Sequence, residues 1–179
     1  MFPAGFDPQP VLTGRTLHLR PMTTDDRDPL FAAASDPLIW EQHPARNRHE
    51  RAVFDPYFDA QLARGSALVV ERRTDGRVIG TSCYYVTDEV PPAVSIGFTF
   101  LERAHWGGAT NHEMKTLMLD HIFVSLDTAW LHVGTDNIRS QKATEKLGAT
   151  LRYQADLDLG NGPARYLCYA LPRSVWRGQ

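Results

Sequence analysis

The chain has 179 residues, of which 42% are hydrophobic and 22% are charged, and its formal net charge is -2. These values are typical of a globular protein, and the length suits one core better than two, so we predict a single domain over residues 1–179. The two charge signs are interspersed, without the basic excess of nucleic-acid-binding proteins, and no apolar run is long enough for a transmembrane helix. We therefore expect neither a nucleic acid nor a membrane as a partner.

The N-terminal third predicts one strand and two helices. Residues 1–11 contain several prolines and no apolar stretch of the kind found in signal peptides, so we expect an extended arm. Hydrophobic and polar residues alternate over 16–20, which predicts a short strand. Residues 23–36 and 49–64 have the composition of helices, and we expect Pro56 to interrupt the second of them.

The middle of the chain predicts a meander of three strands. The first two, 67–73 and 77–86, flank the turn 74–76, whose Asp-Gly pair is a strong hairpin signal. A loop is expected at Pro91 and Pro92, and the third strand is predicted over 93–101. Gly97 lies inside it and indicates a bulge or a close approach by another group.

The last third alternates between strands and helices. An apolar stripe predicts a largely buried helix over 111–125, and strand 129–135 follows it. A second helix is predicted over 137–147, and two final strands over 149–159 and 164–171. The resulting order is β-α-α-β-β-β-α-β-α-β-β. Such an order favours an α+β fold in which a mixed sheet carries helices on both faces.

The cysteines and histidines do not have the spacing of metal ligands. Cys83 and Cys168 both lie in strand-like apolar runs, so we predict buried free thiols and, by default, a reducing cytoplasmic location. His105, His112 and His121 are too widely spaced for a compact metal pair. We predict no metal site.

Two glycines and an alanine precede the 111–125 helix in the stretch WGGATNHEMK. The small side chains of Gly107, Gly108 and Ala109 leave several backbone N–H groups unshielded. Thr110 and Glu113 have the spacing of a capping box, which would fix the helix start beside the turn. Free N–H groups at the positive end of a helix dipole form an anion site. The simpler alternative is a turn that uses glycine only for positive φ, and the Glu113 carboxylate would repel an anion unless it faced the cap.

The helix predicted over 137–147 places polar groups on its inward face. Asn137, Ser140, Thr144 and Leu147 share one side of this helix, and Ala143 accompanies them. Two small polar side chains that point inward need partners. A ligand is one solution. The other is that Asn137 simply caps the helix and Ser140 bonds the backbone.

Taken together, these segments resemble the GNAT superfamily of acetyl-CoA-dependent N-acetyltransferases, and within it the Rim-type branch. The resemblance spans about residues 12–171. The stretch 104–109 is similar to the family's Gln/Arg-x-x-Gly-x-Gly/Ala turn, and 35–44 to a segment between the branch's first two helices. The branch signature Asn-x-x-Ser-x-x-x-x-Glu-Lys-x-Gly is matched at Asn137, Ser140, Glu145, Lys146 and Gly148.

The resemblance implies a mostly antiparallel sheet that splays between its fourth and fifth predicted strands, leaving a slot for pantetheine. It implies acetyl-CoA as cosubstrate, with the cofactor-binding residues Phe100, Leu101, Trp106, Gly107, Gly108, Ala109, Thr110, Asn111, Asn137 and Ser140. An N–H near Phe100 or Leu101 would polarise the thioester carbonyl. Asn137 would hold the pantetheine arm and Ser140 would protonate the leaving thiolate, so both are the predicted catalytic residues.

The sequence does not single out one residue as the proton acceptor. Ala104 stands where Gln or Arg is usual, residues 94–101 contain no acid, and Ser140 replaces a common tyrosine. Candidate bases are Glu41, His43 and His132. Trp40, Glu41 and His43 are the predicted acceptor-binding residues.

The predicted acceptor is a primary amine of a small molecule or a protein N-terminus, and a homodimer is compatible with the sequence. One alternative is a non-catalytic CoA- or acyl-CoA-binding regulatory module on the same fold. A weaker one is a nucleotide binder.

Overall fold

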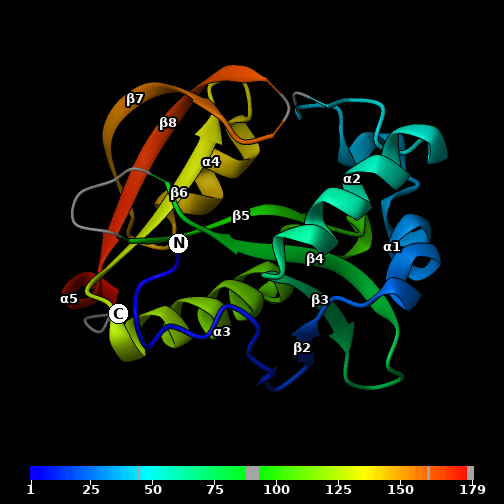
Figure 1. Ribbon diagram of the computed structural model, residues 1–179, viewed down its shortest axis with the longest axis horizontal. Helices are drawn as coiled ribbons and strands as arrows, with labels where there is room; N and C mark the ends of the chain where they lie inside the picture. Colours follow the sequence, from blue (N-terminus) through cyan, green and yellow to red (C-terminus); the bar gives the residue numbers. More distant parts are fainter. Residues whose placement is uncertain (44, 88–92, 161, 177–179) are drawn as a thin grey trace.

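The computed structural model describes residues 1–43, 45–87, 93–160 and 162–176. Its centre is an eight-stranded sheet with the order β1-β2-β3-β4-β5-β6-β8-β7, in which every neighbouring pair is antiparallel except β5 and β6 (Figure 1). The strands are β1 Leu12–Thr13, β2 Leu17–Pro21, β3 Ala67–Arg72, β4 Val78–Tyr85, β5 Val94–Leu101, β6 Thr128–Gly134, β7 Thr150–Asp158 and β8 Pro163–Pro172. The predicted α+β fold with a mixed, mostly antiparallel sheet is confirmed.

Helices cover both faces of the sheet (Figure 1). The α-helices are α1 Arg27–Ala34, α2 Arg51–Arg64, α3 Ala109–Ser125, α4 Ile138–Glu145 and α5 Arg173–Trp176. The 3-10 turns are η1 Thr24–Asp26, η2 Pro37–Ile39 and η3 Arg103–His105. None of the helices in the described part of the chain is long and apolar enough to cross a membrane.

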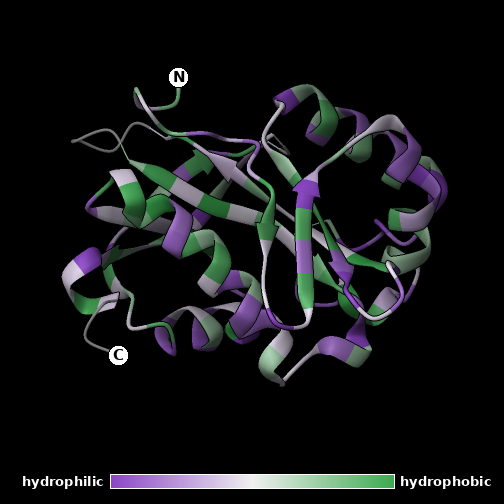
Figure 2. Cartoon of the chain, turned by 90° about the horizontal axis from the view of Figure 1, so that it is seen from below, coloured by the Kyte–Doolittle hydropathy of each residue, from purple (hydrophilic) through white to green (hydrophobic). Residues whose placement is uncertain are grey.

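The core consists of two hydrophobic clusters, one on each face of the sheet. One cluster packs α3, through Met114, Met118 and Ile122, against the strands. The other packs α1 and α2, through residues such as Leu30 and Phe54, against the opposite face. Figure 2 shows the strands between the helices as largely hydrophobic. The continuously buried runs of β3 and β4 therefore reflect their position between two helical layers.

The meander over residues 67–101 follows the prediction closely. β3 and β4 are joined by the predicted tight turn, in which Gly76 has φ +71° and donates its N–H to the Arg72 carbonyl at 2.8 Å. Cys83 and Cys168 are buried and unbridged, as predicted. The loop expected at Pro91 and Pro92 lies outside the described residues.

The helical segments differ from the predictions at their boundaries. The helix expected over 23–36 divides into η1 and the shorter α1, and the one expected over 49–64 begins at Arg51. Pro56 does not interrupt α2. Proline removes one backbone hydrogen bond from a helix, but Phe54 and Phe58 on either side of it are buried in the core and hold the helix in place.

Candidate active site

A cavity of about 260 Å³ opens where β5 and β6 separate. These parallel strands pair only at Val94 with Ala129 and at Ser95 with Trp130, and beyond these pairs they diverge (Figure 1). The cavity is lined by β5 and β6, by the first turns of α3 and by α4. The predicted splay between the fourth and fifth predicted strands is therefore present, and it creates a slot that no strand fills.

A β-bulge shapes the β5 side of the slot. Thr81 of β4 pairs with Phe100 and Cys83 pairs with Gly97, so β5 contains one extra residue at this point. Phe98 lies in the bulge and has φ +52°, a conformation that is costly for an aromatic residue. The bulge that the sequence indicated at Gly97 is present, and it re-aims the backbone beside the slot.

The backbone of Leu101 faces the slot. The Glu102 N–H donates to the carbonyl of Ile79 on the neighbouring strand β4 at 2.8 Å. In an antiparallel pair the backbone groups of successive residues face opposite edges of the strand, so those of Leu101 face away from β4. Accordingly, the Leu101 carbonyl accepts a hydrogen bond from the Trp106 indole at 3.0 Å on the slot side. The N–H of Leu101 lies on the same edge as its carbonyl, whereas the backbone of Phe100 pairs with β4.

The glycine turn leads directly into the open end of α3. Gly107 has φ +67°, Gly108 is the N-cap, and the helix begins at Ala109. No side chain in the described part of the chain caps this end, and its first turn holds no acidic residue. The N–H groups of a first helical turn have no partner within the helix. Those of α3 therefore remain available beside the slot, at the positive end of the helix dipole.

The predicted capping box at Thr110 and Glu113 is wrong. The Glu113 carboxylate turns away from the start of α3 and accepts hydrogen bonds from Thr16 N at 2.7 Å, Thr16 Oγ1 at 2.5 Å and Leu17 N at 3.3 Å. A β-carbon at Gly14 would lie 2.3 Å from the same carboxylate, so Gly14 makes this close approach feasible. Glu113 thus joins α3 to β2, and its negative charge is compensated away from the turn.

Replacing Glu113 with alanine should lower the free energy of unfolding by about 1 kcal/mol at neutral pH, because the donors at Thr16 and Leu17 lose a charged acceptor. Burial by itself would raise the pKa of Glu113, but the hydrogen bonds from Thr16 and Leu17 outweigh it and lower the pKa. A lowered folded-state pKa stabilises the protein above the unfolded-state pKa, and this contribution is lost as the pH falls through the folded-state value. Urea denaturation of both proteins should show a difference that shrinks in acid. The neighbouring exposed His112→Ala variant is the control, and equal stability of wild type and E113A at neutral pH would contradict the assignment.

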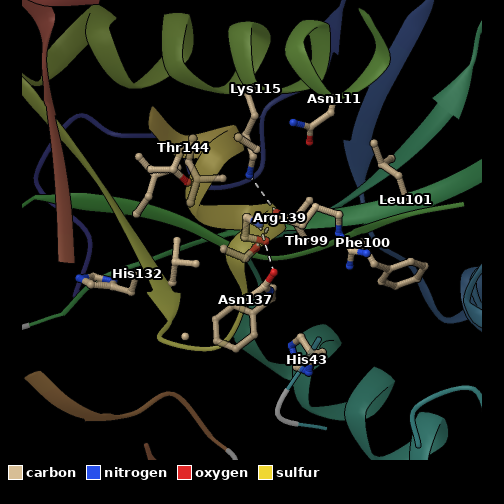
Figure 3. Close-up of a pocket in the computed structure, with 18 of the residues that line it drawn as sticks. His43, Thr99, Phe100, Leu101, Asn111, Lys115, His132, Asn137, Arg139 and Thr144 are labelled. Carbon is tan, nitrogen blue, oxygen red and sulfur yellow. Dashed lines mark hydrogen bonds between the residues drawn. The ribbon is translucent and has the colours of Figure 1, made fainter. Parts of the chain in front are cut away.

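Asn137 and Ser140 lie together at the start of α4 and line the slot. Asn137 is the N-cap, and its Oδ1 accepts the Ser140 N–H at 3.1 Å (Figure 3). Asn137 therefore caps the helix, as the simpler alternative predicted. The cap uses only its side-chain oxygen and leaves the side-chain nitrogen unused. The Ser140 hydroxyl makes no hydrogen bond to any residue that the structure describes, and Thr144 and Leu147 are buried further along the same face.

A sequence model of the GNAT acetyltransferase domain family matches residues 16–150. The chain belongs to the GNAT acetyltransferase family. Members of this family transfer an acetyl group from acetyl-CoA, so the protein is an acyltransferase with acetyl-CoA as cosubstrate. A comparison with curated proteins finds no match.

Solved structures of the same fold agree with this family membership. A probable GNAT acetyltransferase from Chromobacterium violaceum is similar with TM-score 0.81 at 18% identity, over 97% of this chain and 91% of that one. A GCN5-related N-acetyltransferase from Brucella melitensis gives TM-score 0.75 at 19% identity, over 94% and 81%. Mycobacterium smegmatis RimJ in complex with CoA-disulfide gives TM-score 0.68 at 20% identity, over 97% and 91%. At these identities the likeness concerns the fold.

The slot of this GNAT domain fits acetyl-CoA on its own geometry. An uncapped helix end without acidic side chains suits a pyrophosphate. The slot-facing N–H and carbonyl of Leu101 suit an amide-bearing arm laid along the strand. Trp106 and Arg139 also line the slot, and the Arg139 guanidinium lies 3.8 Å from the centre of the Trp106 indole ring.

Trp40 and His43 line the GNAT slot, whereas Glu41 is exposed and does not line it. Trp40 is buried and donates its indole N–H to the Ala34 carbonyl at 2.8 Å. His43 Nδ1 accepts the Ala45 N–H at 2.9 Å, and Arg48 lies 3.3 Å from Nε2. Burial, reinforced by the charge of Arg48, lowers the pKa of His43 to about 3. A ring this hard to protonate is a weak proton acceptor.

His132 lines the slot from β6 and is the third candidate base. Its exposed fraction is 9%, and its Nδ1 lies 2.7 Å from the Tyr85 hydroxyl. Tyr85 also lines the slot and contacts Phe98 in the bulge, with 5.2 Å between ring centres. His132 is thus held against β4 by a buried tyrosine.

Three cationic residues that sequence reasoning did not assign to the site also line the slot: Arg48, Lys115 and Arg139. No carboxylate of the described residues accompanies them there. The sequence carried one signal for Lys115, which lies on the stripe of α3 that also contains Met118 and Ile122 and is otherwise apolar. No local sequence pattern around Arg48 indicates that it lines the slot, because Arg48 reaches the cavity from the segment before α2.

Proposed function

We propose that this GNAT domain is an N-acetyltransferase of the Rim-type branch, acting on a primary amine of a small molecule or a protein N-terminus. The observation that carries the proposal is the slot itself, which places an open helix end, a free strand edge and the Ser140 hydroxyl along one channel. The Asn-x-x-Ser-x-x-x-x-Glu-Lys-x-Gly signature and the similarity in fold to RimJ favour the Rim-type branch.

Each part of the slot has a role in this proposal. The N–H groups from Trp106 to Asn111 bind the pyrophosphate, with Gly107 setting the direction of the turn. The pantetheine pairs with the open edge of β5 as an added strand. The Leu101 N–H, which faces the slot, donates to the thioester oxygen as negative charge develops there.

The residues at the start of α4 complete the cofactor side. The Asn137 side-chain nitrogen is left over from the helix cap and donates to a pantetheine carbonyl. The Ser140 hydroxyl, which has no partner among the described residues, donates to the leaving thiolate. On the acceptor side, Trp40, His43 and Tyr166 surround the amine, and Glu41 at the rim contacts it only if the acceptor extends out of the cavity.

Calorimetry with acetyl-CoA, followed by thiol release over a panel of amines, tests the proposal. The panel contains a polyamine, an amino sugar and short peptides with free N-termini. We expect saturable binding and CoA release that depends on the acceptor. No binding at millimolar acetyl-CoA would rule the proposal out. Binding without release from any amine would favour a non-catalytic acyl-CoA-binding module instead. A homodimer and a cytoplasmic location remain predictions.

A further inference from the structure

Lys115 is an ammonium-bearing residue placed in an apolar interior. It lies on the second turn of α3 with an exposed fraction of 7%, and the neighbouring Met114 and Met118 are fully buried. Its Nζ points into the slot and donates one hydrogen bond, to Thr99 Oγ1 at 2.9 Å (Figure 3). A charged lysine has three N–H donors, and burying them with a single neutral partner is unfavourable.

No carboxylate among the described residues that line the cavity compensates the charge of Lys115. The titratable side chains that line its cavity are His43, Arg48, Tyr85, His132, Arg139 and Tyr166, and none of these is a carboxylate. Glu113, which is close along the same helix, faces Thr16 and Leu17 instead. Burial in these surroundings lowers the pKa of Lys115 to about 7. A substantial share of Lys115 is therefore neutral near pH 7, with a lone pair free to accept a proton.

Thr99 holds this amine at a fixed place beside the reacting edge of β5. Thr99 lies in the bulge, between Phe98 and Leu101, and its hydroxyl is 2.7 Å from Ser82 Oγ. Because the hydroxyl is anchored to β4 on one side, it positions the Lys115 Nζ on the other. The amine therefore lines the same slot as Leu101, whose N–H faces it.

We propose that Lys115 is a catalytic residue that accepts the proton of the acceptor amine, an inference that rests on the proposed function. The acceptor nitrogen forms a bond to the thioester carbonyl carbon and becomes positively charged. Neutral Lys115 removes one proton from this nitrogen, and the carbon–sulfur bond then breaks. The proton passes to the departing thiolate, with the Ser140 hydroxyl hydrogen-bonded to the sulfur, so Lys115 is neutral again at the end of the turnover.

The cationic lining of the slot is consistent with this role. Positive neighbours such as Arg48 and Arg139 disfavour the charged form of an acceptor amine bound beside them. Burial is what lowers the pKa of Lys115 itself. A carboxylate base, of which the described lining of the slot holds none, would stabilise both amines in their unreactive charged form.

The experiment compares Lys115→Met and Lys115→Arg with the control Lys142→Met, an exposed lysine on α4. Methionine keeps the length of the side chain and fits the apolar surroundings. Arginine keeps a positive charge but cannot act as a base near neutral pH. For each protein we would measure acetyl-CoA affinity by calorimetry, and the pH profile of kcat/KM with the best acceptor of the amine panel.

A second readout does not depend on activity. The protein is labelled with ¹³C-lysine, and the Cε resonances of Lys115, Lys142 and Lys146 are followed against pH without any ligand. The Lys115→Met variant identifies the resonance of interest. We expect it to titrate near pH 7.

We expect both Lys115 variants to lose about 10²-fold or more in kcat, with acetyl-CoA affinity within about threefold of wild type. The wild-type and Lys142→Met profiles should rise through about pH 7 because the neutral amine is the active form, and this rise should vanish without Lys115. The inference is overturned if Lys115→Arg retains activity, if affinity falls in parallel with turnover, or if the Lys115 resonance titrates near 10. If the wild type turns over and the Lys115→Met variant has the same pH profile, the proposed function stands and the role of Lys115 is overturned. If the wild type shows no acceptor-dependent CoA release, both the proposed function and the role of Lys115 are overturned.

Discussion

Replacing Gly107 with valine should weaken acetyl-CoA binding by about 10- to 100-fold. Gly107 has φ +67°, and a β-branched residue reaches this conformation only at a cost of at least 1–2 kcal/mol, so the backbone of the turn will move. A β-carbon at this position would meet nothing within 4 Å, which excludes a steric clash as the cause. The loss follows because the first N–H groups of α3 no longer converge on the pyrophosphate. Calorimetry on the purified variant measures it, and each factor of ten corresponds to about 1.4 kcal/mol.

Gly76 provides a matched control for this substitution. It has φ +71° in the turn between β3 and β4, and a β-carbon there also meets nothing within 4 Å. Gly76→Val should therefore lower stability to a similar extent while leaving acetyl-CoA affinity unchanged. If G107V binds as tightly as wild type, the pyrophosphate is held elsewhere. If G76V weakens binding equally, the effect is one of general stability.

The parts of the fold that were predictable from the sequence depend on local patterns. The first two strands of the meander were placed by the Asp-Gly turn between them, and β3, β4 and β5 pair with neighbours close in the chain. The capping box at Thr110 and Glu113 was also locally consistent, but Glu113 found its donors at Thr16 and Leu17, about a hundred residues earlier in the sequence. A contact of that kind overrides the local preference and leaves no trace in the helix sequence.

The site shows the same division. The glycine turn and the Asn137–Ser140 pair were found because the residues that act together are adjacent in sequence. Neither the Lys115–Thr99 contact nor the approach of Arg48 could be found in this way, since each joins segments that only the folded sheet brings together. Among the candidate bases, the sequence could not separate His43 from Glu41. The structure shows that the ring nitrogens of His43 already face donors and that Glu41 lies outside the cavity lining.

Ser140→Ala should lower kcat by about 10²-fold and leave acetyl-CoA affinity within about threefold of wild type. The hydroxyl is free of other partners among the described residues, so its removal takes away a donor to the leaving sulfur without disturbing a structural bond. The Asn137 cap survives the change because it uses the backbone N–H of Ser140. The expected loss is at the lower end of the range for general acids, since a thiol with an ordinary pKa near 8.5 leaves with modest assistance.

Steady-state kinetics and calorimetry on S140A separate this role from a structural one. Ser125→Ala, an exposed serine at the end of α3, is the control and should match wild type in both measurements. If S140A keeps wild-type turnover and affinity, the hydroxyl serves only to pack the start of α4. If affinity falls while kcat is retained, Ser140 holds the cofactor and the proton must reach the sulfur directly from Lys115. The double variant with Lys115→Met distinguishes these routes, because two residues on one proton path should show effects that are far from additive.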